Sequence, residues 1–138
     1  MANEATLIVE KELPVAFTCA EATGIEKGTF LTLSDPNTVA ATGANANAIV
    51  IGIAAEEKIG GDGKTKIGVY MRGIFKVLAG GAITVGDNVE SHSVAQEVVT
   101  ATQTANATAN IIGKSLETAA DTDTFLMDLN PIQIKDPA

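Results

Sequence analysis

The chain has 138 residues, the length of a single domain, and carries 9 basic and 17 acidic residues, so its formal net charge is −8. Nucleic-acid binding depends mainly on Lys and Arg that neutralise phosphates, so this charge predicts no nucleic-acid partner. A lone cysteine cannot form a disulfide within the chain or a zinc ribbon. No apolar run approaches the roughly 18 residues that a membrane-spanning helix needs. We therefore expect no membrane partner, no metal and no cofactor.

Apolar residues in the middle of the chain alternate with polar ones, which is the period of a β-strand. Segments rich in Gly, Asn, Asp and Thr separate these runs. The predicted strands are residues 29–33, 48–53, 66–71, 73–78, 109–113 and 124–129. Residues 93–109 are ambiguous, and the run from Val98 to Thr100 favours strand and loop. The pattern predicts an all-β fold, a compact β-sandwich or partly closed barrel of the β-tulip or jelly-roll type.

The two ends of the chain differ from this centre. Residues 5–9 are β-prone, but acidic residues flank them and Pro14 removes a backbone donor. This region suits an edge strand or an extended arm better than a central strand. We expect an extended N-terminal arm over residues 1–16 and a single all-β domain over residues 17–138. The tail, residues 130–137, is also expected to be extended.

A weak internal repeat is visible in the sequence. Residues 28–31, 51–56 and 66–74 have counterparts in residues 86–89, 112–117 and 123–129. Each series contains a strand after a glycine, a long loop, an apolar strand with a glycine, an acidic turn and a second apolar strand. Two such units would each leave one sheet face uncovered, so we expect them to pack together and close the core.

The residues that could carry chemistry do not form a catalytic pattern. Residues 60–65 (GGDGKT) end like a phosphate-binding loop, but Lys58 stands where that motif needs its first glycine, and a strand pattern follows it. A glycine-rich turn fits this segment better. His92, the single histidine, lies among polar residues, and Cys19 is expected in the core or an interface. We predict no catalytic residue and no enzyme activity.

Residues 51–54 (IGIA), 73–78 (GIFKVL) and above all 79–89 (AGGAITVGDNV) resemble the small decoration proteins, also called cement proteins, of tailed-phage capsids. Residues 112–119 and the closing apolar strand fit the same pattern, which rests on turn and core residues. The resemblance implies a structural virion protein that binds the outer surface of the expanded capsid as a homotrimer. It further implies the major capsid protein as partner, stabilisation against internal DNA pressure, and synthesis in the cytoplasm of the host bacterium.

The N-terminal arm is the expected contact with the capsid. An arm that adds a strand to a capsid sheet would draw affinity from main-chain hydrogen bonds. The expected capsid-binding residues are the apolar ones of this segment: Leu7, Ile8, Val9, Leu13 and Phe17.

Two other classes of function stay open at this point. A trimeric all-β nucleotide hydrolase needs an aspartate beside a glycine-rich strand, but Tyr70 and Met71 stand where that carboxylate is wanted. A generic small-ligand-binding β-barrel for sugars would favour aromatic residues, and the chain has one Tyr and no Trp.

Overall fold

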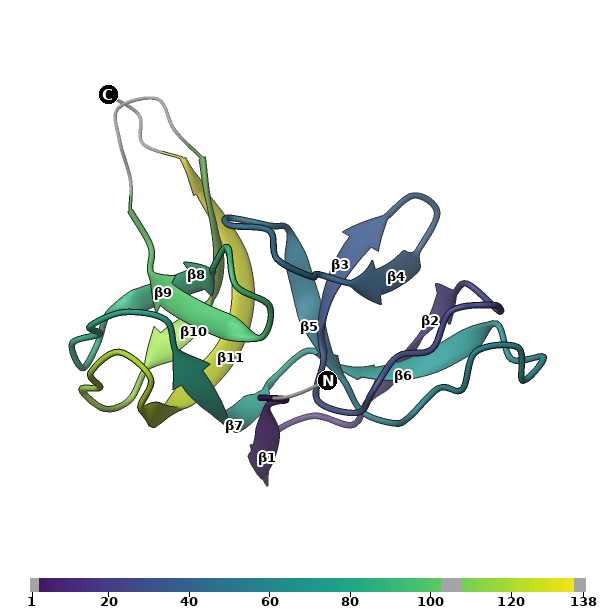
Figure 1. Cartoon of the computed structure of the whole chain (residues 1–138), viewed down its shortest axis with the longest axis horizontal. Helices are drawn as coiled ribbons and strands as arrows, with labels where there is room; N and C mark the ends of the chain where they lie inside the picture. Colours follow the sequence, from purple (N-terminus) through teal and green to yellow (C-terminus); the bar gives the residue numbers. More distant parts are fainter. Residues whose placement is uncertain (1–2, 103–107, 136–138) are drawn as a thin grey trace.

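The computed structural model describes residues 3–102 and 108–135, and the regular elements within these ranges are eleven β-strands. The all-β prediction is confirmed. The strands form two lobes that lie side by side (Figure 1). Each lobe is a small barrel, so the partly closed barrel of the prediction occurs twice in one chain.

The first barrel consists of five short strands. Its members are β2 (Val15–Cys19), β3 (Phe30–Ser34), β4 (Thr38–Ala41), β5 (Val50–Ala54) and β6 (Lys66–Tyr70). They close in the order β2-β4-β3-β5-β6, with β6 pairing back on β2. Only the β2–β4 pair is parallel. The interior is filled by small and branched side chains, including Leu31, Val39 and Val69.

The second barrel is built in the same way from the rest of the chain. Its strands are β7 (Gly73–Ala79), β8 (Asn88–Ser91), β9 (Glu97–Thr100), β10 (Thr108–Ser115) and β11 (Thr124–Lys135). They follow the order β7-β11-β10-β8-β9, and a parallel pairing of β9 with β7 closes the ring. The remaining strand, β1 (Thr6–Glu10), lies outside this ring and pairs with β7.

The internal repeat is confirmed, because β2 to β6 and β7 to β11 pair in the same order and the same directions. Matching hydrogen bonds join matching strands: Gly28 N donates to Ala54 O, and Gly86 N donates to Ser115 O. Both glycines have φ of 90°, which a side chain would strain. One expectation differs from the structure. We expected the core to close when the two units pack together, whereas each repeat closes a barrel of its own. The parallel pair between its first and third strands supplies that closure.

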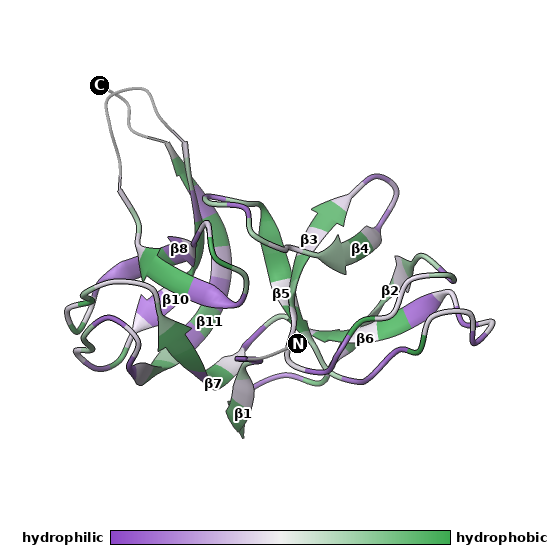
Figure 2. Ribbon diagram, viewed as in Figure 1, coloured by the Kyte–Doolittle hydropathy of each residue, from purple (hydrophilic) through white to green (hydrophobic). Residues whose placement is uncertain are grey.

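The two barrels share a buried interface. Phe30, Val50 and Ile53 of the first barrel belong to the same apolar cluster as Phe75 and Ile112 of the second. Figure 2 shows the apolar colour of β5 where it faces this seam. Apolar area removed from water stabilises the contact by about 25 cal/mol per Å².

A buried amide crosses the same interface. Gln96, before β9, is 4% exposed, and its Oε1 accepts a hydrogen bond from Phe30 N at 2.9 Å. Its Nε2 donates to Gly28 O at 2.9 Å. Buried backbone groups that lose such partners cost free energy, so this amide fixes how one barrel sits on the other.

The ends of the chain are strands of the fold. Residues 6–10 form the edge strand β1, one of the two alternatives left open by the sequence, and residues 15 and 16 begin β2. The tail is extended as expected over residues 130–135, within β11. Residues 136–138 and 103–107, the latter part of the ambiguous segment, lie outside the described residues.

Replacing Gln96 with Leu should destabilise the fold. The change leaves Phe30 N–H buried without its acceptor and removes one donor from Gly28 O, so we expect a loss of about 2 kcal/mol in the free energy of unfolding. Urea denaturation would measure it. Gln133→Leu is the control, since the amide of Gln133 bonds Asn110 at the surface. Equal midpoints for the two variants would contradict the role of Gln96.

Candidate functional site

The edge strand β1 is the first part of the candidate site. It pairs with β7 alone, with Leu7 opposite Phe75 and Val9 opposite Ile74. The register shifts between Leu7 and Val9, so Ile8 is the extra residue of a bulge. Leu7 packs against the core of the second barrel, whereas Ile8 is 50% exposed and Val9 is also exposed. The side of β1 away from β7 carries backbone groups that a further strand could pair with.

The segment after β1 also carries exposed apolar side chains. Leu13, in the connection to β2, is 76% exposed, and Val15 at the start of β2 is exposed as well. Phe17 is half-buried against the core of the first barrel. We call Ile8, Val9, Leu13 and Val15 the N-terminal surface.

The structure therefore divides the five residues expected to bind the capsid. Ile8, Val9 and Leu13 face solvent, while Leu7 and Phe17 anchor the two ends of the segment on different barrels. Sequence reasoning did not single out Val15. Its place next to Pro14 and Leu13 was the available signal, but only the structure shows that it lies on the outside of β2.

Several contacts join the end of β1 and the residue after it to the barrels. Lys11 Nζ lies 2.7 Å from Asp128 Oδ1 of β11, an exposed ion pair that adds little stability by itself. Tyr70 packs edge-on against Phe75, with ring centroids 5.7 Å apart. Burial, followed by a hydrogen bond with the Glu10 side chain, raises the pKa of Tyr70. The end of β1 is thus fastened where β6 passes into β7.

The residues considered for catalysis lie in different barrels. Cys19 is buried in the first barrel, and this burial raises the pKa of its thiol. His92 follows β8 in the second barrel, with its Nδ1 3.3 Å from Glu97 Oε1. Within residues 3–102 and 108–135, no three His, Cys, Asp or Glu side chains gather as a metal site would require. No helix in the same ranges is long and apolar enough to cross a bilayer.

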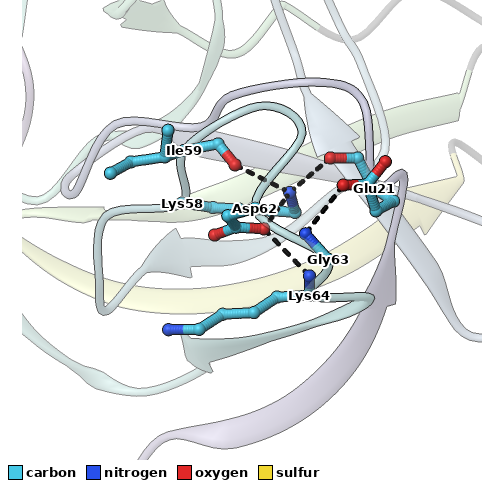
Figure 3. Close-up of polar contacts among 6 residues, drawn as sticks. All are labelled: Glu21, Lys58, Ile59, Asp62, Gly63 and Lys64. Atoms are coloured by element: carbon cyan, nitrogen blue, oxygen red, sulfur yellow. Dashed lines mark hydrogen bonds and ion pairs between the residues drawn. The ribbon is translucent and has the colours of Figure 1, made fainter.

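The segment that imitates a phosphate-binding loop is a turn held from within, as the sequence favoured. Lys58 is buried, and its Nζ donates to Glu21 O at 2.7 Å, to Ile59 O at 3.2 Å and to Asp62 Oδ1 at 3.1 Å (Figure 3). Asp62 Oδ1 also accepts from Lys64 N. This backbone hydrogen bond, with the Lys58 ammonium beside it, lowers the pKa of Asp62. Lys58 therefore acts as an internal cation for this loop.

Comparison with known proteins agrees with this architecture. The fold is similar to a solved structure described as "head fiber gp8.5 N base in bacteriophage phi29", with a TM-score of 0.55 and 22% sequence identity. The similarity covers 84% of this chain and 93% of that chain. No curated protein sequence matches.

The family is shown directly by the sequence. The phage cement protein family matches residues 8–129, which is most of the chain, and the chain belongs to that family. It is therefore a structural protein associated with the phage capsid, and the resemblance noted in the sequence is confirmed. Membership of a structural family agrees with the expectation that the chain is not an enzyme.

Replacing Lys58 with Met should loosen the loop after β5. The variant removes the buried ammonium from the Glu21 and Ile59 carbonyl oxygens and from the Asp62 carboxylate, each of which keeps one backbone N–H donor. We expect a loss of about 1 to 3 kcal/mol in the free energy of unfolding, because hydrogen bonds from a charged donor are lost. Lys64→Met is the control because it keeps the backbone N–H that Asp62 accepts. Thermal unfolding at neutral pH would compare them.

The difference in the free energy of unfolding between Lys58→Met and Lys64→Met should become smaller in acid. The Lys64 backbone N–H, which both variants keep, is the largest cause of the lowered pKa of Asp62, and the Lys58 ammonium is a smaller one. The share that Lys58 contributes through Asp62 is present above the ordinary aspartate pKa and is lost as pH falls through the lowered value. Equal free energies of unfolding for the two variants at neutral pH would contradict the role of Lys58 as an internal cation. A difference that grows on acidification would contradict it as well.

Proposed function

We propose that this protein binds the outer surface of the expanded phage capsid as a homotrimer and stabilises the shell against the pressure of packaged DNA. It is synthesised in the host cytoplasm and its partner is the major capsid protein. Membership of the cement protein family supports a place on the capsid. The net charge of −8 supports the outer surface, because an acidic protein is repelled by packaged DNA.

The N-terminal surface is the proposed attachment site, and the observation that carries this assignment is the open edge of β1. A strand of the major capsid protein added to this edge would form main-chain hydrogen bonds. Ile8, Val9 and Leu13 would lose water-exposed apolar surface at the same time. Leu7 and Phe17 support the contact from behind, since both pack on the barrels.

Stabilisation of the shell follows from selective binding. A ligand that binds only the expanded lattice stabilises that state by mass action, in proportion to the logarithm of its free concentration over its dissociation constant. Three copies held together raise the effective concentration of each attachment segment, so weak single contacts combine into firm binding.

The double variant Ile8→Asp, Leu13→Asp should lose capsid attachment while keeping its fold. A charge on each exposed side chain opposes burial, so we expect binding to expanded capsids to weaken by roughly tenfold or more. Co-sedimentation with capsids lacking this protein would measure the binding.

Val85→Asp is the matched control, because Val85 is 57% exposed on the second barrel, outside the N-terminal surface. Capsids incubated with the double variant should rupture on heating at nearly the temperature of undecorated capsids. Full binding and protection by the double variant would show that the contact lies elsewhere on the barrels.

A further inference from the structure

The internal repeat allows the surfaces of the two barrels to be compared residue by residue. Leu33 lies opposite Val39 in the first barrel, and Ser91 lies opposite Val98 in the second. Val39 and Val98 are themselves equivalent, since they pair in parallel with Cys19 of β2 and Ala79 of β7. Leu33 therefore corresponds to Ser91.

Two further pairs follow from the same register. Asn37 and Gln96 each stand two residues before the equivalent valines, and both have positive φ, 47° and 65°. Ile49 and Asn110 each stand five residues before Ala54 and Ser115, which accept matching hydrogen bonds. The first barrel thus has Leu33, Asn37 and Ile49 where the second has Ser91, Gln96 and Asn110.

In the second barrel, these three positions supply polar contacts with the first barrel. Ser91 Oγ accepts from Ala48 N at 2.8 Å and donates to Asn45 O at 2.7 Å. Asn110 N donates to Asn47 Oδ1 at 2.7 Å, and its Nδ2 donates to Asn47 O at 2.8 Å. Gln96 adds the buried bridge described above. This face of the repeat is therefore a surface that receives another barrel.

In the first barrel, the equivalent face is open. Leu33 and Ile49 are exposed, the latter by 55%, and together with Asn37 and two neighbours they line a shallow pocket. We call Leu33, Asn37 and Ile49 the β3–β5 face. Ile49 also borders a groove shared with Ile111 and Ile132, so the face continues into the seam between the barrels. In Figure 1 the end of β3 and the start of β5 lie at the upper edge, away from β1.

We propose that the β3–β5 face binds a second copy of this chain and is the surface through which the free protein assembles into its trimer. The inference rests on the proposed function for the trimeric state. The occupant is another copy because the equivalent face already receives a barrel of this same chain. Leu33 and Ile49 are apolar at the positions where Ser91 and Asn110 form hydrogen bonds between the two barrels. Apolar side chains at these positions suit a contact between separate molecules.

Charge supports the same occupant. Each copy carries a net charge of −8, so two copies repel unless they meet through a face with few charges. Asp35 is the single charged residue that lines the pocket at the β3–β5 face. A ring of three copies requires a head-to-tail contact, in which this face on one copy meets a different surface on the next.

The experiment compares variants in which the first barrel takes the residues of the second. Leu33→Ser and Ile49→Asn copy Ser91 and Asn110, and the double variant should keep a folded structure in circular dichroism. Sedimentation of full-length protein should give three copies for the wild type. For the double variant, we expect self-association to weaken by roughly tenfold or more, with monomer present at concentrations where the wild type is trimeric.

Ile59→Asn is the matched control, since Ile59 is 69% exposed but lies in the loop after β5. If the double variant unfolds, Ile49→Asn alone provides the same comparison. A wild type that is monomeric, or variants of the β3–β5 face that assemble as the wild type does, would overturn the proposal.

Co-sedimentation with capsids separates this proposal from the proposed function. A wild type that forms trimers sensitive to Ile49→Asn but does not bind capsids contradicts the capsid role and supports the β3–β5 face. A wild type that binds capsids but whose assembly is insensitive to Ile49→Asn overturns the face alone.

Discussion

The arrangement of the two barrels depends on the bridge made by Gln96. Its amide joins a loop of the second barrel to the backbone at Gly28 and Phe30, inside a cluster of apolar side chains from both lobes. A buried amide with both groups satisfied permits one orientation and penalises others, because a rotated barrel would leave buried polar atoms unpaired. The N-terminal surface needs this rigidity. Its segment is anchored by Leu7 on one barrel and by Phe17 on the other.

The two repeats share their pairing but have diverged in their surfaces and loops. The loop between β5 and β6 runs over residues 55–65, longer than the equivalent residues 116–123, and Lys58 occupies the position of Ala119. A longer loop has more carbonyl groups to satisfy, and the buried ammonium satisfies two of them together with Asp62. The shorter loop has no buried cation, and the Ser115 hydroxyl donates to Glu117 O. Its turn closes through backbone bonds, such as that from Asp123 N to Ala120 O.

Much of the fold could be predicted from the sequence, because alternation and turn residues are local signals. The repeat was visible partly through the glycine in each apolar strand. A Cβ at Gly52 would clash with Tyr70 O, and one at Gly113 with Asp128 O. The closure of each barrel could not be predicted. Each closure depends on a parallel pair between the first and third strands of the repeat, and both of these strands also pair with another strand. In addition, β4 consists of small residues and carries a weak strand signal.

The candidate site could be predicted in part for the same reason. A β-prone run beside a proline marks an edge, so the sequence pointed to Ile8, Val9 and Leu13, and all three are exposed. Burial is set by tertiary contacts, so the inward position of Leu7 and the bridging role of Gln96 were not visible. Leu33 and Ile49 were concealed in another way. They belong to apolar runs in which Leu31, Val50 and Ile53 are buried, and only the structure shows that these two positions face solvent.

The small size of the apolar surfaces constrains how such a protein can hold a capsid. A stable protein interface buries roughly 1,200 to 2,000 Å² in total, and the few side chains of the N-terminal surface supply only part of that. An added strand supplies hydrogen bonds, yet each offers little net free energy because water competes for the same groups. Attachment through the proposed site would therefore gain most from several copies that act as one body. The rigid pair of barrels allows this, because the β3–β5 face and β1 lie at opposite edges of one unit in Figure 1. In the proposed arrangement, contact between copies at one edge would leave the other edge free to bind the shell, and the attachment of one copy would position those of its neighbours.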